Sequence, residues 1–279
     1  DAMLQRMISA LALMLAVLAV ARPAVAADEP VLTITLAGQT QKYTATQLLK
    51  RSDVEDLTIA NDVAYQKKMS YRAVPLLNLL GPAQALTFDT LEAAATDGYV
   101  SQLPMAAILG GSQGKAKAWI AIEPPSKPWP KLPKKSISAG PFFLVWQHPE
   151  RSDIDSGKWP YALAELRAVR SPMQRWPQIR VSDGTGADAP ASRGMQAYIK
   201  HCLACHKIDG AGESVIGPDL LRPMSPLDYM TVRGLKALVR DPASVRTWPK
   251  QEMSGISKDA LSDQSLEDLI VYLRHMRDK

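Results

Sequence analysis

Cys202-Leu203-Ala204-Cys205-His206 is the stretch that decides how this 279-residue chain is interpreted, and its two cysteines are the only ones in the sequence. A Cys-x-x-Cys pair can form a disulfide or act as a thioredoxin-like redox pair. The histidine that follows argues against both, because Cys-x-x-Cys-His is the pattern of c-type haem attachment: the thiols add to the haem vinyl groups and the histidine binds the iron. We therefore expect one covalent haem c, held by Cys202, Cys205 and His206.

The N-terminal residues have the pattern of a secretory signal peptide. Arg6 precedes an apolar run from Ile8 to Ala21, and a small-residue stretch follows at Ala24-Val25-Ala26-Ala27. The apolar run is shorter than the roughly 20 residues that a membrane-spanning helix needs, so we expect cleavage rather than a retained anchor. The sequence thus predicts a signal peptide at residues 1–27 and a periplasmic protein with no stable membrane insertion after cleavage.

The remaining length favours two domains. A small, polar stretch rich in Gly and Pro predicts a linker at residues 183–191, between an α+β domain at 28–182 and an all-α domain at 192–279. The formal net charge of +5 suits an acidic redox partner and is too small to indicate nucleic-acid binding.

The C-terminal segment is expected to be mostly helical. Ser192 is a candidate N-cap for a first helix that ends at the haem motif. A second helix is expected over Leu235–Arg240 and to stop at Pro242. A third is expected from about Ser262, where Leu266, Leu269, Ile270 and Leu273 follow the helical period.

Residues 190–279 resemble the class I cytochrome c family. The resemblance rests on the haem motif, on Gly217-Pro218-Asp219-Leu220, on Met253 and on the segment from Leu261 to Leu273. It implies that the first and last helices cross near the haem edge. It also implies that the backbone carbonyl of Pro218 accepts the ring N–H of His206, which would fix the orientation of the imidazole.

Met253 is the expected sixth iron ligand. It lies far enough beyond His206 for the chain to reach the opposite haem face, although Ser254 stands where the family usually has proline. Met224 remains an alternative, whereas His201 is expected to point away and Met195 and Met230 to fill the core. Trp248 either contacts the haem edge or a propionate, or is ordinary core. Axial binding by His206 and Met253 favours electron transfer over haem catalysis.

The N-terminal half is similar to the sulfite-oxidase-like molybdopterin-binding fold, with a mixed sheet. The similarity is carried by Tyr71-Arg72-Ala73-Val74-Pro75-Leu76, by Ala95-Thr96-Asp97-Gly98-Tyr99 and by Gly140-Pro141-Phe142-Phe143-Leu144-Val145-Trp146. Catalytic members bind molybdenum through a cysteine thiolate. This chain has no cysteine outside the haem motif, so we expect neither molybdopterin nor catalytic residues in this half.

Other features of this half have simple interpretations. Val31–Leu36, Trp119–Glu123 and Phe142–Trp146 are expected as strands, and Tyr71–Leu80 as a loop entering a helix. Asp97-Gly98-Tyr99 is expected as a turn with a packed aromatic ring, and His148 as an exposed loop residue rather than a metal ligand. The lysine-rich stretch from Lys115 to Lys135 is expected as a solvated loop, with a basic docking face for an acidic partner as the alternative.

These observations favour a periplasmic electron carrier or electron-transfer subunit over an independent enzyme, with a redox protein, for example a periplasmic dehydrogenase, as partner. The alternatives are a self-contained molybdopterin oxidoreductase of the sulfite dehydrogenase type and a haem sensor that binds small ligands.

Overall fold

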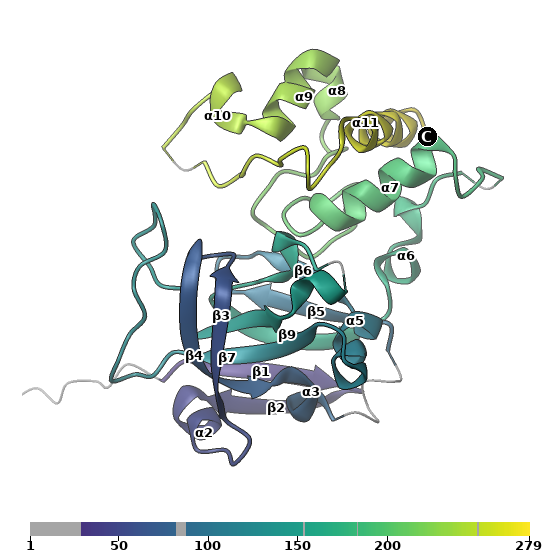
Figure 1. The fold of residues 1–279 in the computed structure, drawn as a ribbon. Helices are drawn as coiled ribbons and strands as arrows, with labels where there is room; N and C mark the ends of the chain where they lie inside the picture. The colour runs from purple at the N-terminus through teal and green to yellow at the C-terminus, as the bar shows by residue number, and fades with distance from the viewer. Residues whose placement is uncertain (1–28, 82–87, 153, 183, 250) are drawn as a thin grey trace, which may run out of the picture.

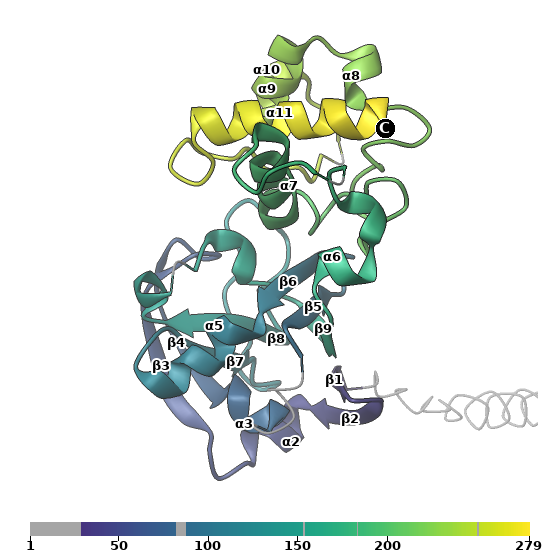
Figure 2. The ribbon, with the colours of Figure 1, turned by 90° about the vertical axis from the view of Figure 1, so that its right-hand side faces the viewer.

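The computed structural model describes residues 29–81, 88–152, 154–182, 184–249 and 251–279. The predicted signal peptide at residues 1–27 lies outside them. The described chain forms a strand-rich N-terminal part and a helical C-terminal part that lies above it in Figure 1. Figure 2 shows the helical part resting over the end of β5 and β6. Within the described ranges, no helix combines the length and the apolar character that a membrane span requires.

The strands of the N-terminal part form two sheets, ordered β2-β1-β9-β5-β6 and β3-β4-β7-β8. Neighbours pair antiparallel, except β1 and β9, which run parallel. The strands are β1 (Val31–Leu36), β2 (Gln39–Thr44), β3 (Glu55–Asp62), β4 (Lys67–Pro75), β5 (Thr90–Ala95), β6 (Val100–Pro104), β7 (Lys117–Ile122), β8 (Phe142–Gln147) and β9 (Leu163–Val169).

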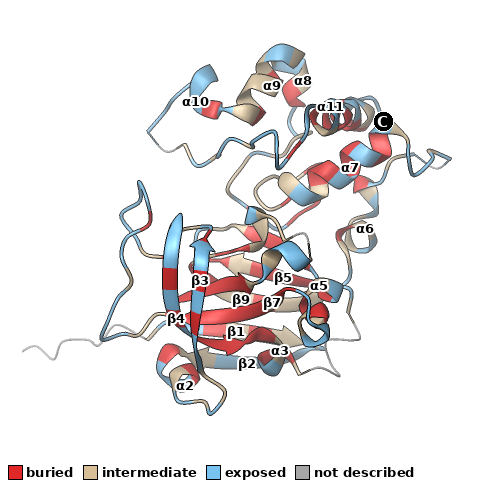
Figure 3. Cartoon of the chain, viewed as in Figure 1, coloured by how far each residue is buried: buried red, intermediate tan, exposed pale blue. Residues whose placement is uncertain are grey.

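One hydrophobic core lies between these sheets. Both contribute fully buried side chains, such as Leu32 and Leu166 from one and Ile120 and Phe143 from the other. Residues 142–146 of β8 are buried without interruption, which is typical of a strand covered on both faces (Figure 3). The short helices α2 (Ala45–Leu49), α3 (Leu76–Leu80) and α5 (Met105–Gly110) complete this part. The expected α+β character with a mixed sheet is therefore confirmed.

Local strand predictions succeeded where the pattern was strong and failed at one place. The expected strands at Val31–Leu36 and around Trp119 and Phe142–Trp146 correspond to β1, β7 and β8. The expected loop at Tyr71–Pro75 was wrong, because these residues lie in β4 and pair with both β3 and β7. Lys117 likewise begins β7, and its Nζ lies 4.0 Å from the ring centroid of Trp119, so only part of the lysine-rich stretch is loop.

The C-terminal part is built around two long helices that cross. Its helices are α6 (Pro172–Arg175), α7 (Pro190–His201), α8 (Pro226–Tyr229), α9 (Val232–Arg240), α10 (Pro242–Val245) and α11 (Asp263–Asp278). At the crossing the backbone of Gly194 in α7 touches that of α11, where a Cβ on Gly194 would overlap the carbonyl of Asp268. The rings of Tyr198 and Tyr272 pack nearby, with centroids 5.7 Å apart.

The helix ends agree with the sequence at α11 and α9 and differ at α7. Ser262 caps α11 by accepting the backbone N–H of Ser265, as expected. Helix α9 ends at Arg240, two residues before Pro242. Helix α7 begins at Pro190, so Ser192 is not its N-cap. The Ser192 hydroxyl is instead buried inside the first turn and donates to the carbonyl of Gly186, while proline supplies the fixed φ that suits a first helical position.

The segment that precedes the predicted linker packs with the helical part. Ile179 is fully buried in the C-terminal core, and Met173, Trp176 and Val181 pack against that core. The hydroxyl of Tyr272 in α11 donates to the carbonyl of Ile179 at 2.7 Å. The packing of the C-terminal part thus begins soon after β9, before the linker predicted at residues 183–191.

The helix crossing leads to a stability prediction. Gly194→Ala places a methyl group against the Asp268 carbonyl, so α7 and α11 must separate, and we expect a loss of about 1–3 kcal/mol in the free energy of unfolding. Denaturant unfolding of the haem-loaded chain measures it. Gly186→Ala is the control, because a Cβ there meets nothing within 4 Å. Equal stabilities of the two variants would contradict the close crossing.

Candidate haem site

The haem motif forms a tight turn at the C-terminal end of α7. The backbone N–H of Cys202 donates to the carbonyl of Tyr198 at 2.8 Å, and that of His206 donates to the carbonyl of Cys202 at 2.8 Å. Both cysteines are free thiols and half-buried. Burial raises the pKa of Cys202 to about 12 and that of Cys205 to about 11, so both thiols are protonated at neutral pH. The turn therefore presents two unpaired thiols and one imidazole within five residues.

His206 is held both at its ring and at its backbone. Its Nδ1 lies 2.9 Å from the carbonyl oxygen of Pro218, which is the contact implied by the resemblance. A carbonyl only accepts, so Nδ1 carries the proton and Nε2 keeps its lone pair for a metal. The hydroxyl of Tyr198 donates to the backbone carbonyl of His206 at 2.9 Å. Burial lowers the pKa of His206 and outweighs the opposite effect of the Pro218 contact, so the ring is neutral, as a metal ligand must be.

The loop after the motif wraps tightly around this ring. A Cβ on Gly217 would overlap the His206 ring, and the N–H of Gly217 donates to the carbonyl of Cys205 at 2.8 Å. The carboxylate of Asp219 accepts the backbone N–H groups of Asp209 and Gly210 at 3.0 and 2.7 Å. Burial raises the pKa of Asp219, but its backbone donors outweigh that effect and hold the pKa below its usual value. Asp219 thus closes the loop as a carboxylate.

Met253 lies on a loop that is fastened to the end of α9. The N–H of Ile256 donates to the carbonyl of Val239 at 2.9 Å, and the guanidinium of Arg240 donates to the carbonyls of Ile256 and Leu261 at 3.1 and 2.6 Å. Gly255 packs directly on the backbone of Arg240. Met253 is half-buried and packs against the C-terminal core.

The other candidates of the sequence analysis lie in different surroundings. Met224 is 51% exposed and Trp248 47% exposed, so Trp248 is not an ordinary core residue. Met195 is buried in the C-terminal core and Met230 packs against it, as expected. His201 is half-buried at the end of α7, and burial lowers its pKa.

The N-terminal part contacts the haem motif directly, which the sequence did not reveal. Asp97-Gly98-Tyr99 forms the turn between β5 and β6, and the ring of Tyr99 is packed, as predicted, with its hydroxyl donating to the carbonyl of Gly157 at 2.8 Å. Next to this turn, the N–H of Val100 donates to the carbonyl of Ala204 at 3.0 Å. The Ser214 hydroxyl donates to the carbonyl of Gly98 at 2.9 Å. Only the tertiary fold brings these segments together.

Ion pairs also join the two parts. The carboxylate of Glu92 is fully buried and is paired with Arg167 and Arg175, and Arg175 reaches Glu213 at 2.8 Å. Burial raises the pKa of Glu92, but hydrogen bonds from Gln102 and the two arginines outweigh it, so the pKa lies below its usual value. Lys135 lies 3.8 Å from Glu252, beside Met253.

His148 contributes nothing to this site. It is exposed, with its Nδ1 3.5 Å from Glu150, and within the described ranges no three His, Cys, Asp or Glu side chains are grouped so as to hold a metal.

The packing of Gly217 leads to a test of the proximal geometry. Gly217→Ala would push the His206 ring off its contact with Pro218, because the added methyl group overlaps the ring. We expect a changed absorption spectrum of the haem-loaded chain and an unfolding midpoint below that of the unaltered chain. Gly186→Ala, whose Cβ meets nothing, should leave the spectrum unchanged. A wild-type spectrum for Gly217→Ala would contradict the assignment.

One comparison with known proteins bears on this geometry. Residues 191–277 match the family model Cytochrome c. No curated protein matches the chain. The match covers the haem motif, the Gly217-Pro218 loop, Met253 and α11. A cytochrome c domain implies haem c and an electron-transfer haem protein. Residues 191–277 of this chain form a cytochrome c domain.

Proposed function

We propose that this protein is a periplasmic monohaem cytochrome that transfers single electrons between a redox partner, such as a dehydrogenase, and a downstream acceptor. The observation that carries the proposal is the His206 imidazole, whose Nδ1–H donates to the Pro218 carbonyl and leaves the Nε2 lone pair for iron, four residues from Cys202 and one from Cys205. One haem is expected because the two cysteines belong to a single motif.

The roles of the site residues follow from their chemistry. Cys202 and Cys205 form thioether bonds to the haem vinyl groups, and His206 supplies the proximal nitrogen. Met253 supplies the thioether on the opposite face, which is supported by its half-buried side chain and by the exposure of Met224. A site with both axial positions taken by side chains has no place for oxygen or peroxide and favours the reduced iron.

The proposal also covers the location of the protein and the role of its N-terminal part. Residues 1–27 direct export to the periplasm. The N-terminal part is proposed to have the sulfite-oxidase-like fold and to serve as a docking part without molybdopterin. Support comes from the hydrogen bond of Val100 to Ala204, within the haem motif, and from that of Ser214 to Gly98, both of which join this part to the cytochrome domain.

Haem attachment is tested on the purified, haem-loaded chain. We expect one iron and no molybdenum per chain, and a pyridine haemochrome spectrum typical of two thioether bonds. Cys202→Ala and Cys205→Ala should each shift that spectrum toward a single thioether bond. More than one haem per chain, haem that solvent extraction removes, or stoichiometric molybdenum would each overturn the proposal.

The axial ligand is tested by two methionine variants. Met253→Ala should abolish the methionine–iron charge-transfer band of the ferric protein and lower the reduction potential, because a thioether favours ferrous iron. Met224→Ala is the matched control and should leave both unchanged, since this side chain is half exposed. The assignment fails if the band survives in Met253→Ala or disappears in Met224→Ala.

A further inference from the structure

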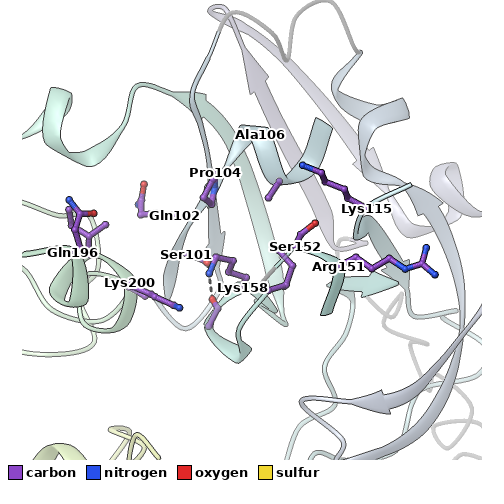
Figure 4. Close-up of a pocket in the computed structure, with 15 residues that line it drawn as sticks. Ser101, Gln102, Pro104, Ala106, Lys115, Arg151, Ser152, Lys158, Gln196 and Lys200 are labelled. Carbon is purple, nitrogen blue, oxygen red and sulfur yellow. Dashed lines mark hydrogen bonds between the residues drawn. The ribbon is translucent and has the colours of Figure 1, made fainter. Parts of the chain in front are cut away.

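We propose that the cavity between the two parts of the chain is a binding site for a small organic anion. The cavity has a volume of about 530 Å³, within the range of pockets that bind small molecules. It is lined by β6, α5 and the turns η2 (Pro149–Arg151) and η3 (Ser156–Lys158) of the N-terminal part and by α7 and Ala204 of the C-terminal part (Figure 4). Its polar side chains include Lys115, Arg151, Lys158, Lys200, Ser101 and Ser152.

The charge of the residues that line the cavity indicates that its ligand is an anion. Four basic side chains border the cavity, and its described lining contains no Asp or Glu. Two carboxylates lie behind these cations: Glu150 lies 4.0 Å from Arg151, and Asp155 pairs with Lys158 and lies 3.7 Å from Lys200. The four basic side chains of the described lining outnumber these two carboxylates, and partial burial strengthens the attraction of the cavity for an anion.

The basic groups of one wall are held by backbone contacts. The guanidinium of Arg151 donates to the carbonyl of Gly114 at 3.3 Å, and the Ser152 hydroxyl accepts the N–H of Ala116 at 3.1 Å. These bonds tie the two segments that carry Arg151 and Lys115 to each other. Figure 4 shows Lys115, Arg151 and Ser152 together on this wall. An Arg151 guanidinium that is held in this way loses less side-chain entropy on binding an anion than a free side chain does.

The opposite wall is held in the same way. The hydroxyls of Ser101 and Tyr99 both donate to the carbonyl of Gly157 at 2.8 Å, next to Lys158. Lys158 and Lys200 come from different parts of the chain and share Asp155. This wall therefore exists only when the cytochrome domain is docked.

Between the basic walls the lining is mostly apolar, apart from the amides of Gln102 and Gln196. It includes Pro104, Ala106, Ala107, Ile154 and Ile199. Inorganic phosphate would fill only a fraction of this volume and would leave the apolar surface bare. The ligand class that fits is a small aromatic or aliphatic body that carries one or more acidic groups.

Because the cavity lies beside the haem motif, we expect a bound anion to change the reduction potential of the haem. This part of the inference rests on the proposed function. Ala204, between the two haem-binding cysteines, lines the cavity, whereas the described lining contains neither Cys202 nor Cys205 nor His206. The ligand would thus lie beside the haem motif without displacing the haem. A negative charge there stabilises ferric iron, so the anion must bind more tightly to the oxidised protein and lower its reduction potential.

Calorimetry on the haem-loaded full chain tests the site with naphthalene-1,5-disulfonate as probe. We expect binding of one probe per chain. Lys115→Gln and Arg151→Gln should each weaken it by about fivefold, the upper range for a partly exposed ion pair. The control is Lys131→Gln, an exposed lysine outside the cavity, which should change nothing. No binding, or equal weakening by all three variants, would overturn the site.

The effect of the bound anion on the haem is measured in a separate experiment. Titration of the ferric and ferrous forms should give tighter binding to the ferric form by on the order of a hundredfold, the effect of the two charges of the probe roughly 10 Å away at an effective dielectric constant of about 20. Equal affinities would refute the link to the haem while leaving the anion site standing. A failure of haem attachment would appear in the haemochrome spectrum and would not alter the effect of Lys115→Gln and Arg151→Gln.

Discussion

The close crossing of α7 and α11 is the constraint on which the haem site depends. Gly194 lets the two backbones touch, and Arg193 beside it pairs with Asp268 at 2.7 Å. Helix α7 then runs straight into the haem motif, with Tyr198 one turn beyond the crossing. Tyr198 makes two hydrogen bonds to the motif: its carbonyl accepts the N–H of Cys202, and its hydroxyl donates to the carbonyl of His206. A shift of the crossing would therefore move the proximal histidine.

The buried carboxylate of Glu92 explains why the two parts stay docked. A buried charge is costly unless it is paired, and removing one partner of such a pair costs several kcal/mol. Glu92 in β5 is neutralised by Arg167 from the neighbouring strand and by Arg175 from α6, and Arg175 also binds Glu213 beside the haem loop. Separating the helical part from the sheets would take Arg175 away from Glu92. The buried charge of Glu92 therefore favours a fixed position for the cytochrome domain.

The sequence predicted those features that local pattern determines. Helix α11 follows from the Ser262 cap and the apolar period, and β8 from an unbroken apolar run. The strand at Tyr71–Pro75 was missed because its burial comes from pairing with β3 and β7, which lie elsewhere in the chain. The contact between Val100 and Ala204 had no local signal at all. The sequence of a turn does not show whether solvent or another domain covers it. The domain interface and its cavity could therefore be found only from the tertiary structure.

The two sides of the proposed haem site are fixed by separate means, and this matters for electron transfer. On the proximal side Pro218 and Tyr198 hold both the ring and the backbone of His206. On the other side the guanidinium of Arg240 donates hydrogen bonds to carbonyls of the loop that carries Met253. In the proposed site these contacts keep His206 and the loop that carries Met253 in place when the charge on the iron changes. Little nuclear rearrangement then accompanies each electron, which suits a carrier better than a site that must open to bind substrate.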